Sequence, residues 1–190
     1  MDKKKIIIDS IRSHIDLVES NKKCLVPEIE KCLNVLSSAI KNNKKIIWCG
    51  NGGSASQANH LSAELVGGMY KSKKEPFNSI CLNTDTAFIT AWSNDDDYEN
   101  IFSRQLDALG MKGDILIALS TSGNSKNIIN AVKLASEKKI ESITLTGNDG
   151  GELLKLSNYN INIDSKDTQR IQEIHIMVGH ILCALIENSL

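Results

Sequence analysis

The chain has 190 residues, which is most simply one domain, long enough to bury a hydrophobic core. Its 22 lysines and arginines nearly balance 23 aspartates and glutamates, and the formal net charge of −1 gives no general attraction to nucleic acid or to an anionic membrane. No apolar run approaches the ~20 residues of a membrane-spanning helix, so we expect no membrane partner.

The N-terminal sequence and the number and spacing of the cysteines predict the cellular compartment of the protein. The N-terminus is basic, but its apolar stretch is only three isoleucines long, which argues against a signal peptide. An odd number of cysteines without a close pair is typical of free thiols in a reducing environment. We therefore expect a cytoplasmic protein. The five cysteines are Cys24, Cys32, Cys49, Cys81 and Cys183.

Residues 1–43 predict a pair of helices. Apolar residues recur at helical spacing in both, and Pro27 stands where the second helix would have its first turn. This pair presents more apolar surface than one sheet requires, so we expect it to contribute to oligomerisation. The two stripes are Ile7, Ile11, Ile15 and Val18, then Ile29, Leu33, Leu36 and Ile40.

Five strand-like runs alternate with helical patterns in the rest of the chain, and a long helix is predicted from about Thr168 to Glu187. This alternation predicts an α/β fold, a doubly wound five-stranded parallel sheet with helices on both faces. We expect the flavodoxin-like strand order 2-1-3-4-5 and a single domain over residues 1–190. The runs are residues 45–49, 78–82, 114–119, 142–146 and 159–163.

The loops after the first and third strands are the predicted ligand site, because the strand order reverses between those strands. The first loop reads "GNGGS" (50–54). Its residues Asn51, Gly52 and Gly53 would bring backbone close to a ligand. Ser54 and Gln57 fit a capping box, which is a structural role.

The second loop, "STSGNS" (120–125), offers four hydroxyls at a predicted helix start: Ser120, Thr121, Ser122 and Ser125. A helix N-terminus favours an anion, so a phosphate monoester would fit there. The alternative is that Ser122 or Ser125 merely caps the helix, but a cap needs only one such residue. No Gly-Lys-Ser/Thr sequence follows, which disfavours nucleotide hydrolysis.

Two helices each carry a pair of candidate metal ligands. His60 and Glu64 are four residues apart after the first loop, and Gln172 and His180 share a broad face of the closing helix. Imidazole, carboxylate and amide oxygen could bind a zinc-like ion. Spacing alone also allows ordinary packed or solvated side chains. That is the role we expect for the other two histidines, His14 and His175.

Several segments together resemble the phosphoheptose isomerases, which have the sugar-isomerase (SIS) fold. The similarity covers nearly the whole chain and includes the N-terminal helices. Its segments read "CGNGGSASQANHLSAEL", "SND", "IFSRQLDALG", "GDILIALSTSGNSKNI", "ITLTGNDGG" and "RIQEIHIMVGHILCALIE".

The resemblance implies conversion of sedoheptulose 7-phosphate to D-glycero-D-manno-heptose 7-phosphate, for lipopolysaccharide or another surface polysaccharide such as a capsule. It also implies a homotetramer with active sites at subunit junctions. Zinc would be held by His60, Glu64, Gln172 and His180. The implied substrate contacts are Asn51, Gly52, Gly53, Glu64, Asn94, Asp95, Ser120, Thr121, Ser122, Ser125 and Gln172.

Catalysis by a ketose–aldose isomerase needs a base at carbon and an acid at oxygen. We assign Glu64 as the carbon base and His180 as its acid–base partner. The alternative function is that of a non-catalytic tetrameric relative that binds the bacterial replication initiator. Retention of all four ligand positions favours the enzyme.

The chain departs from the family pattern at four positions. Gln57 stands where members commonly have aspartate, and Gly68 where they often have arginine. Asp96 and Asp97 replace an aromatic-glycine pair. Loss of a nearby carboxylate is expected to weaken metal binding.

Overall fold

The computed structural model describes residues 2–70 and 75–189. Seven α-helices, one 3-10 helix and five strands are found in this part of the chain. In order they are α1 (Lys3–Lys41), β1 (Ile46–Gly50), α2 (Gly53–Gly67), β2 (Ser79–Cys81), α3 (Thr86–Asp95), η1 (Tyr98–Asn100), α4 (Ile101–Leu109), β3 (Ile115–Ser120), α5 (Lys126–Glu137), β4 (Glu141–Gly147), α6 (Leu153–Leu156), β5 (Tyr159–Ile163) and α7 (Thr168–Ser189).

The sheet confirms the predicted architecture. All five strands are parallel and lie in the order β2-β1-β3-β4-β5. Every residue of β1 and β3 is buried, as expected of strands that are covered on both faces. The carboxyl ends of β1 and β3 are therefore adjacent, which brings the two predicted ligand loops side by side.

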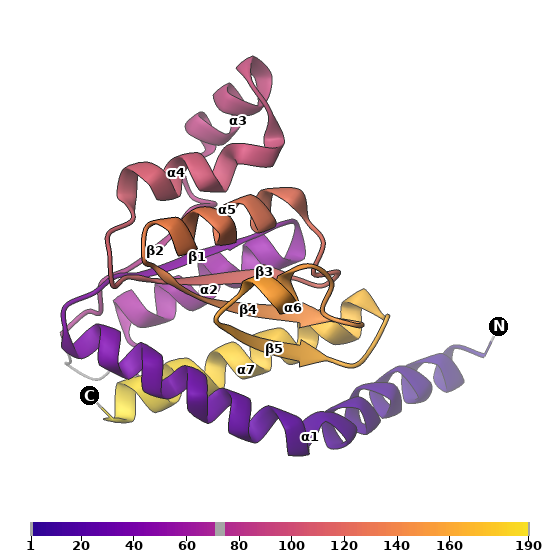
Figure 1. Ribbon diagram of the computed structural model, residues 1–190. Helices are drawn as coiled ribbons and strands as arrows, with labels where there is room; N and C mark the ends of the chain where they lie inside the picture. Colours follow the sequence, from indigo (N-terminus) through magenta and orange to yellow (C-terminus); the bar gives the residue numbers. More distant parts are fainter. Residues whose placement is uncertain (1, 71–74, 190) are drawn as a thin grey trace.

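Alternate residues of β1 and β3 enter two different cores. Ile46 and Trp48 pack with the cluster that includes α1, α2 and α7. Ile47 and Cys49 pack with the cluster that includes α4 and α5. Figure 1 shows these helices as two layers, with α1, α2 and α7 on one side of the sheet and α3, α4 and α5 on the other.

The N-terminal segment is one helix, where the sequence predicts two. Pro27 lies inside α1, and Figure 1 shows that the helix changes direction part-way along. Proline removes one backbone hydrogen bond and bends a helix. Here Leu25 and Ile29, on either side of Pro27, are both buried against the body, so packing holds the helix together across the bend.

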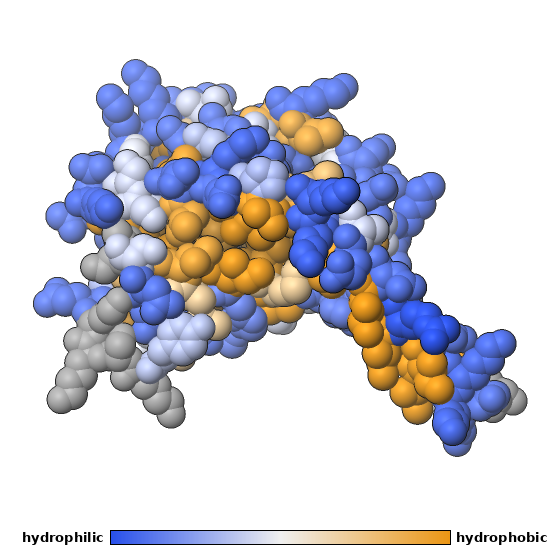
Figure 2. All heavy atoms as spheres, turned by 90° about the horizontal axis from the view of Figure 1, so that it is seen from below, coloured by the Kyte–Doolittle hydropathy of each residue, from blue (hydrophilic) through white to orange (hydrophobic). Residues whose placement is uncertain are grey.

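The first half of α1 projects from the body, and we call residues 3–16 the N-terminal arm. Three of its isoleucines, Ile7, Ile11 and Ile15, are 54–60% exposed. Figure 2 shows apolar atoms along this arm and in a broader patch on the body. No helix in the described ranges is both long and apolar enough to span a bilayer.

Candidate active site

The first loop leaves β1 at Gly50 and enters α2 at Gly53. Gly52 has a φ of +55°, which favours glycine. A side chain at position 53 would collide with Gln172, because a Cβ there would lie 2.7 Å from its Oε1. Asn51 accepts a hydrogen bond from Tyr98 at 3.0 Å. The loop therefore brings its backbone close to α7, and its predicted contact with a ligand stays a prediction.

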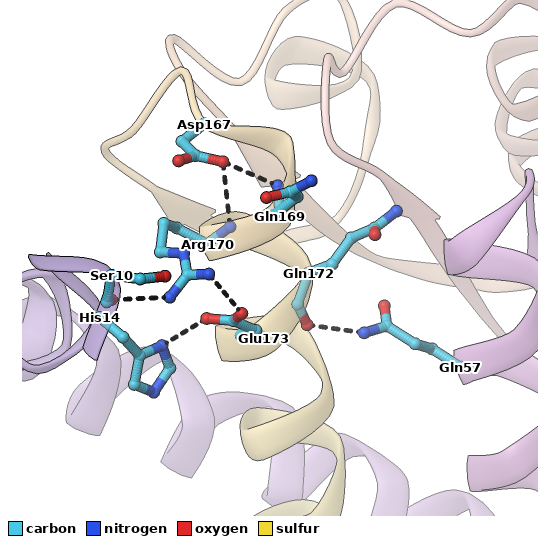
Figure 3. A network of polar contacts seen from close by, with 8 residues as sticks. All are labelled: Ser10, His14, Gln57, Asp167, Gln169, Arg170, Gln172 and Glu173. Atoms are coloured by element: carbon cyan, nitrogen blue, oxygen red, sulfur yellow. Dashed lines mark hydrogen bonds and ion pairs between the residues drawn. The ribbon is translucent and has the colours of Figure 1, made fainter. Parts of the chain in front are cut away.

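The predicted capping box is wrong. Gly52 is the N-cap of α2, without a side-chain cap bond, so Ser54 lies inside the first turn. Because Gly52 adopts a positive φ, α2 begins at Gly53, whereas a capping box would have made Ser54 the N-cap. Gln57 instead donates from Nε2 to the Gln172 carbonyl at 2.6 Å and so links α2 to α7 (Figure 3). Its Oε1 is buried and has no hydrogen-bond partner among the residues that the structure describes.

Side chains of the second loop do not cap α5. Ser125 occupies the N-cap position, but its side chain makes no cap hydrogen bond. Ser120 Oγ donates to Ser125 Oγ at 3.2 Å, and Ser122 Oγ accepts from the Asn124 N–H at 3.1 Å. The capping alternative is therefore not what the structure shows, and these hydroxyls stay together at the carboxyl end of β3.

The turn after β4 holds this second loop in shape. Gly123 has a φ of +66°, and a Cβ there would lie 2.0 Å from the Gly150 carbonyl oxygen. Asn124 Oδ1 accepts from the Glu152 N–H at 2.9 Å across the same contact. The loop is thus preorganised by close backbone packing.

Beside the second loop is a hollow of about 240 Å³. Sequence reasoning identified Thr121 and Ser122 in its lining but missed Lys166 and Thr168. Their position after β5, at the same carboxyl edge of the sheet, was the available signal. The lining residues are Thr121, Ser122, Asn148, Lys166, Thr168 and Ile171.

His60, Glu64 and His180 converge where α2 crosses α7. The Nε2 atoms of the two histidines lie 2.9 Å apart, and His60 Nε2 lies 3.4 Å from Glu64 Oε1. Potential ligand atoms of all three residues lie within 4.8 Å of one another. Gly179 makes the crossing possible, because a Cβ there would lie 2.2 Å from Leu61 Cδ1.

Gln172, the fourth predicted ligand, lies two helical turns before His180, beside the first loop. Its Nε2 is 3.5 Å from Ser54 Oγ. Figure 3 shows its side chain on the α2 side of α7, whereas Arg170 and Glu173 face α1. Three of the four predicted ligands, His60, Glu64 and His180, therefore form a compact group, and the contacts of the Gln172 side chain are with the first loop.

Asn94 and Asp95 lie away from this group, at the end of α3, which has no buried residue. Both are exposed, and Asn94 Nδ2 donates to Asp95 Oδ1 at 2.7 Å. Figure 1 shows α3 standing out from the body. Within this single chain the structure does not bring these two predicted substrate contacts to the loops.

Comparison with known proteins identifies the family. The SIS domain model matches residues 10–147. A phosphoheptose isomerase of Aliarcobacter butzleri is 43% identical over 187 residues, 98% of each chain. The structure of a phosphoheptose isomerase from Neisseria gonorrhoeae superposes with a TM-score of 0.92 at 36% identity, over 98% of this chain and 99% of that one. The structure of a phosphoheptose isomerase from Francisella tularensis superposes with a TM-score of 0.95 at 32% identity, over the full length of both chains.

The chain belongs to the phosphoheptose isomerase family. Membership makes it an enzyme, a sugar phosphate isomerase with a role in heptose biosynthesis, in agreement with the expected function class. The assigned roles of individual site residues stay predictions, which the geometry above supports to different degrees.

Two departures from the phosphoheptose isomerase pattern have local structural roles. Gly68 is the C-cap of α2 with a φ of +82°, a conformation that arginine would adopt only with strain. Asp97 caps η1 by accepting from the Asn100 N–H at 2.6 Å. These substitutions therefore fit the backbone of this family member.

The two histidines outside the cluster are packing residues, as expected. His14 lies 2.8 Å from Glu173 and ties the arm to α7. His175 is fully buried, with Nε2 3.0 Å from the Thr146 carbonyl oxygen, so this nitrogen carries the proton. Burial lowers the pKa of His175 to about 4, which keeps the ring neutral.

Proposed function

We propose that this phosphoheptose isomerase family member converts sedoheptulose 7-phosphate to D-glycero-D-manno-heptose 7-phosphate. The observation that carries the proposal is the convergence of potential ligand atoms of His60, Glu64 and His180 within 4.8 Å of one another, where α2 crosses α7. Two imidazoles and a carboxylate suit the proton transfers of an isomerase, and the hydroxyls of the second loop suit a phosphate group. The product would serve a surface polysaccharide such as lipopolysaccharide or a capsule.

Proton transfer would proceed through an enediol. The Glu64 carboxylate removes a proton from C1 of the ketose, and the C2 carbonyl oxygen receives a proton from His180. Glu64 then returns the proton to C2, while His180 accepts the proton of the C1 hydroxyl, which leaves the aldehyde. Each group contributes on the order of 10²- to 10⁴-fold to the rate. His60, 3.4 Å from Glu64, orients the carboxylate.

Zinc suits the donor set of this cluster, and we propose that it binds there. Two imidazole nitrogens and a carboxylate are common zinc ligands, and two nitrogens on one tetrahedral zinc lie about 3.3 Å apart. His60 and His180 are close to that separation at 2.9 Å. His60, Glu64, His180 and Gln172 would hold the ion. When bound, zinc would stabilise negative charge that develops on the substrate oxygens.

The direct test is incubation of the purified protein with sedoheptulose 7-phosphate, with zinc content measured in the same sample. We expect new aldose signals in the proton NMR spectrum and up to one zinc per chain. Failure to form any aldose with zinc added would exclude the proposed reaction. Aldose formation from zinc-free protein would exclude only the need for the metal.

We also propose that the chain forms a homotetramer through α1. The exposed isoleucines of the N-terminal arm support this, since soluble proteins seldom leave such a continuous apolar row in water. The exposed position of Asn94 and Asp95 on α3 is consistent with a site that is completed by a neighbouring subunit.

A further inference from the structure

The hollow beside the second loop has hydroxyl groups but needs a cation to match a phosphate. A phosphate monoester has about −1.5 to −2 charges at neutral pH. Thr121, Ser122, Asn148 and Thr168 are uncharged, and Lys166 is the one charged residue that lines the hollow. Hydrogen bonds to a charged partner are about twice as strong as neutral ones, so this lysine would matter for binding.

Other cations near the loop already have partners. Lys126, the first residue of α5, pairs with Glu99 at 2.9 Å, and Lys133 on the same helix pairs with Glu152 at 3.1 Å. Arg170 pairs with Glu173 and donates to the Ser10 carbonyl (Figure 3). Across residues 2–70 and 75–189, no ion pair involves Lys166.

Residues on both sides hold the backbone of Lys166 at the rim. The Ser165 carbonyl accepts from the Asn148 N–H at 2.8 Å, which joins this segment to the turn after β4. Asp167 accepts from the Gln169 and Arg170 N–H groups at 3.0 and 3.3 Å, so its carboxylate is committed to the start of α7 (Figure 3). Hydrogen bonds of the neighbouring residues therefore hold the backbone at Lys166 in place, while its ammonium group makes no ion pair within the described residues.

We propose that Lys166 is a substrate-binding residue that supplies the positive charge for the sugar phosphate, with the phosphate seated between Thr121, Ser122 and the Lys166 ammonium group. This inference rests on the proposed function and adds a specificity residue to it. It lies at the carboxyl end of β5, outside the two loops that the sequence motifs identify.

The test compares Lys166→Ala with Lys166→Arg and with Lys112→Ala, an exposed lysine before β3 at the opposite edge of the sheet. With sedoheptulose 7-phosphate, Lys166→Ala should raise KM about tenfold and change kcat less than twofold. Lys166→Arg should stay within about threefold of the parent, and Lys112→Ala should be unchanged. Added salt should raise KM more for the parent than for Lys166→Ala.

Binding of inorganic phosphate, measured by NMR titration without turnover, separates this inference from the proposed reaction. Weaker phosphate binding by Lys166→Ala supports the role of Lys166, even if sedoheptulose 7-phosphate proves not to be the substrate. Equal phosphate affinity in the parent and Lys166→Ala, or no phosphate binding by the parent, would overturn it. Neither of these two results would decide whether the protein isomerises sedoheptulose 7-phosphate, which the aldose assay tests separately.

Discussion

Glu64, the proposed carbon base, has a carboxylate that is partly shielded from solvent and lies beside His60 and near His180. Glu64→Gln keeps the shape of the side chain and removes the proton acceptor. We expect kcat to fall at least ~10²-fold, whereas inorganic phosphate should bind as in the parent. Steady-state kinetics and an NMR phosphate titration measure the two effects. Near-normal turnover would mean that the base lies elsewhere.

His175 gives a pH dependence of stability whose sign follows from its burial. The unfolded chain binds a proton at this residue below about pH 6.5, whereas the folded chain does so only near pH 4. Stability is therefore complete above pH 6.5 and declines as the pH falls towards 4. Between pH 7 and pH 5 the expected loss from this residue is about 2 kcal/mol.

Urea unfolding at both pH values, at one fixed protomer concentration, measures this loss. His175→Gln retains an N–H donor for the Thr146 carbonyl but cannot titrate. The free energy of unfolding of this variant should therefore fall by about 2 kcal/mol less than that of the parent between pH 7 and pH 5. An equal pH dependence in the parent and in the variant would assign the effect to other groups.

Among the elements, the loop from β3 to α5 carries the prediction of a phosphate site. Hydroxyls at a strand end before a helix predicted an anion site, and α5 leaves these hydroxyls free of capping bonds. We expect the double variant Ser122→Ala/Ser125→Ala to raise KM for the sugar phosphate about tenfold while the protein stays folded. Ser136→Ala, an exposed serine in α5, is the matched control. Unchanged KM in the double variant would remove the phosphate assignment.

Other elements show the limits of reading one sequence. The parallel sheet followed from the alternation of helices and strands, because parallel strands need crossover connections, whereas the strand order was taken from the flavodoxin-like pattern and is confirmed. The break at Pro27 did not occur, since burial of Leu25 and Ile29 depends on tertiary contacts that periodicity does not report. Ser54 was misassigned because the positive φ of Gly52 is invisible in the sequence. Lys166 was missed because the hollow forms only when β3, β4 and β5 align.

At the scale of the whole molecule, α1 is a helix whose second half belongs to the core and whose first half is exposed. Chains of 20.9 kDa should assemble into homotetramers near four times that mass in light scattering at micromolar concentration. Replacing Ile7, Ile11 and Ile15 together by serine should lower the mass, because the arm would lose its apolar row. Met111→Ser, at a 70% exposed residue outside the N-terminal arm, is the control. A monomeric parent would contradict this assembly.

The arm also reaches the active-site helix. His14 and the Ser10 carbonyl contact Glu173 and Arg170 on α7, the helix that carries Gln172 and His180 (Figure 3). The proposed subunit interface and the cluster therefore share one helix. The sequence suggested each feature separately but could not indicate that they meet on α7, because Ser10 and Arg170 are 160 residues apart.

The missing side chain at Gly179 has a consequence for how this enzyme can evolve. A Cβ at position 179 would lie 2.2 Å from Leu61 Cδ1, so a larger residue there requires a shift of the Leu61 side chain or of the α2–α7 crossing that carries His60 and His180. The rim of the hollow is different, because Lys166 is exposed and makes no ion pair within residues 2–70 and 75–189. Point substitutions at Lys166 are therefore expected to change how strongly a phosphate group is held, while the packing of α2 against α7 stays as it is.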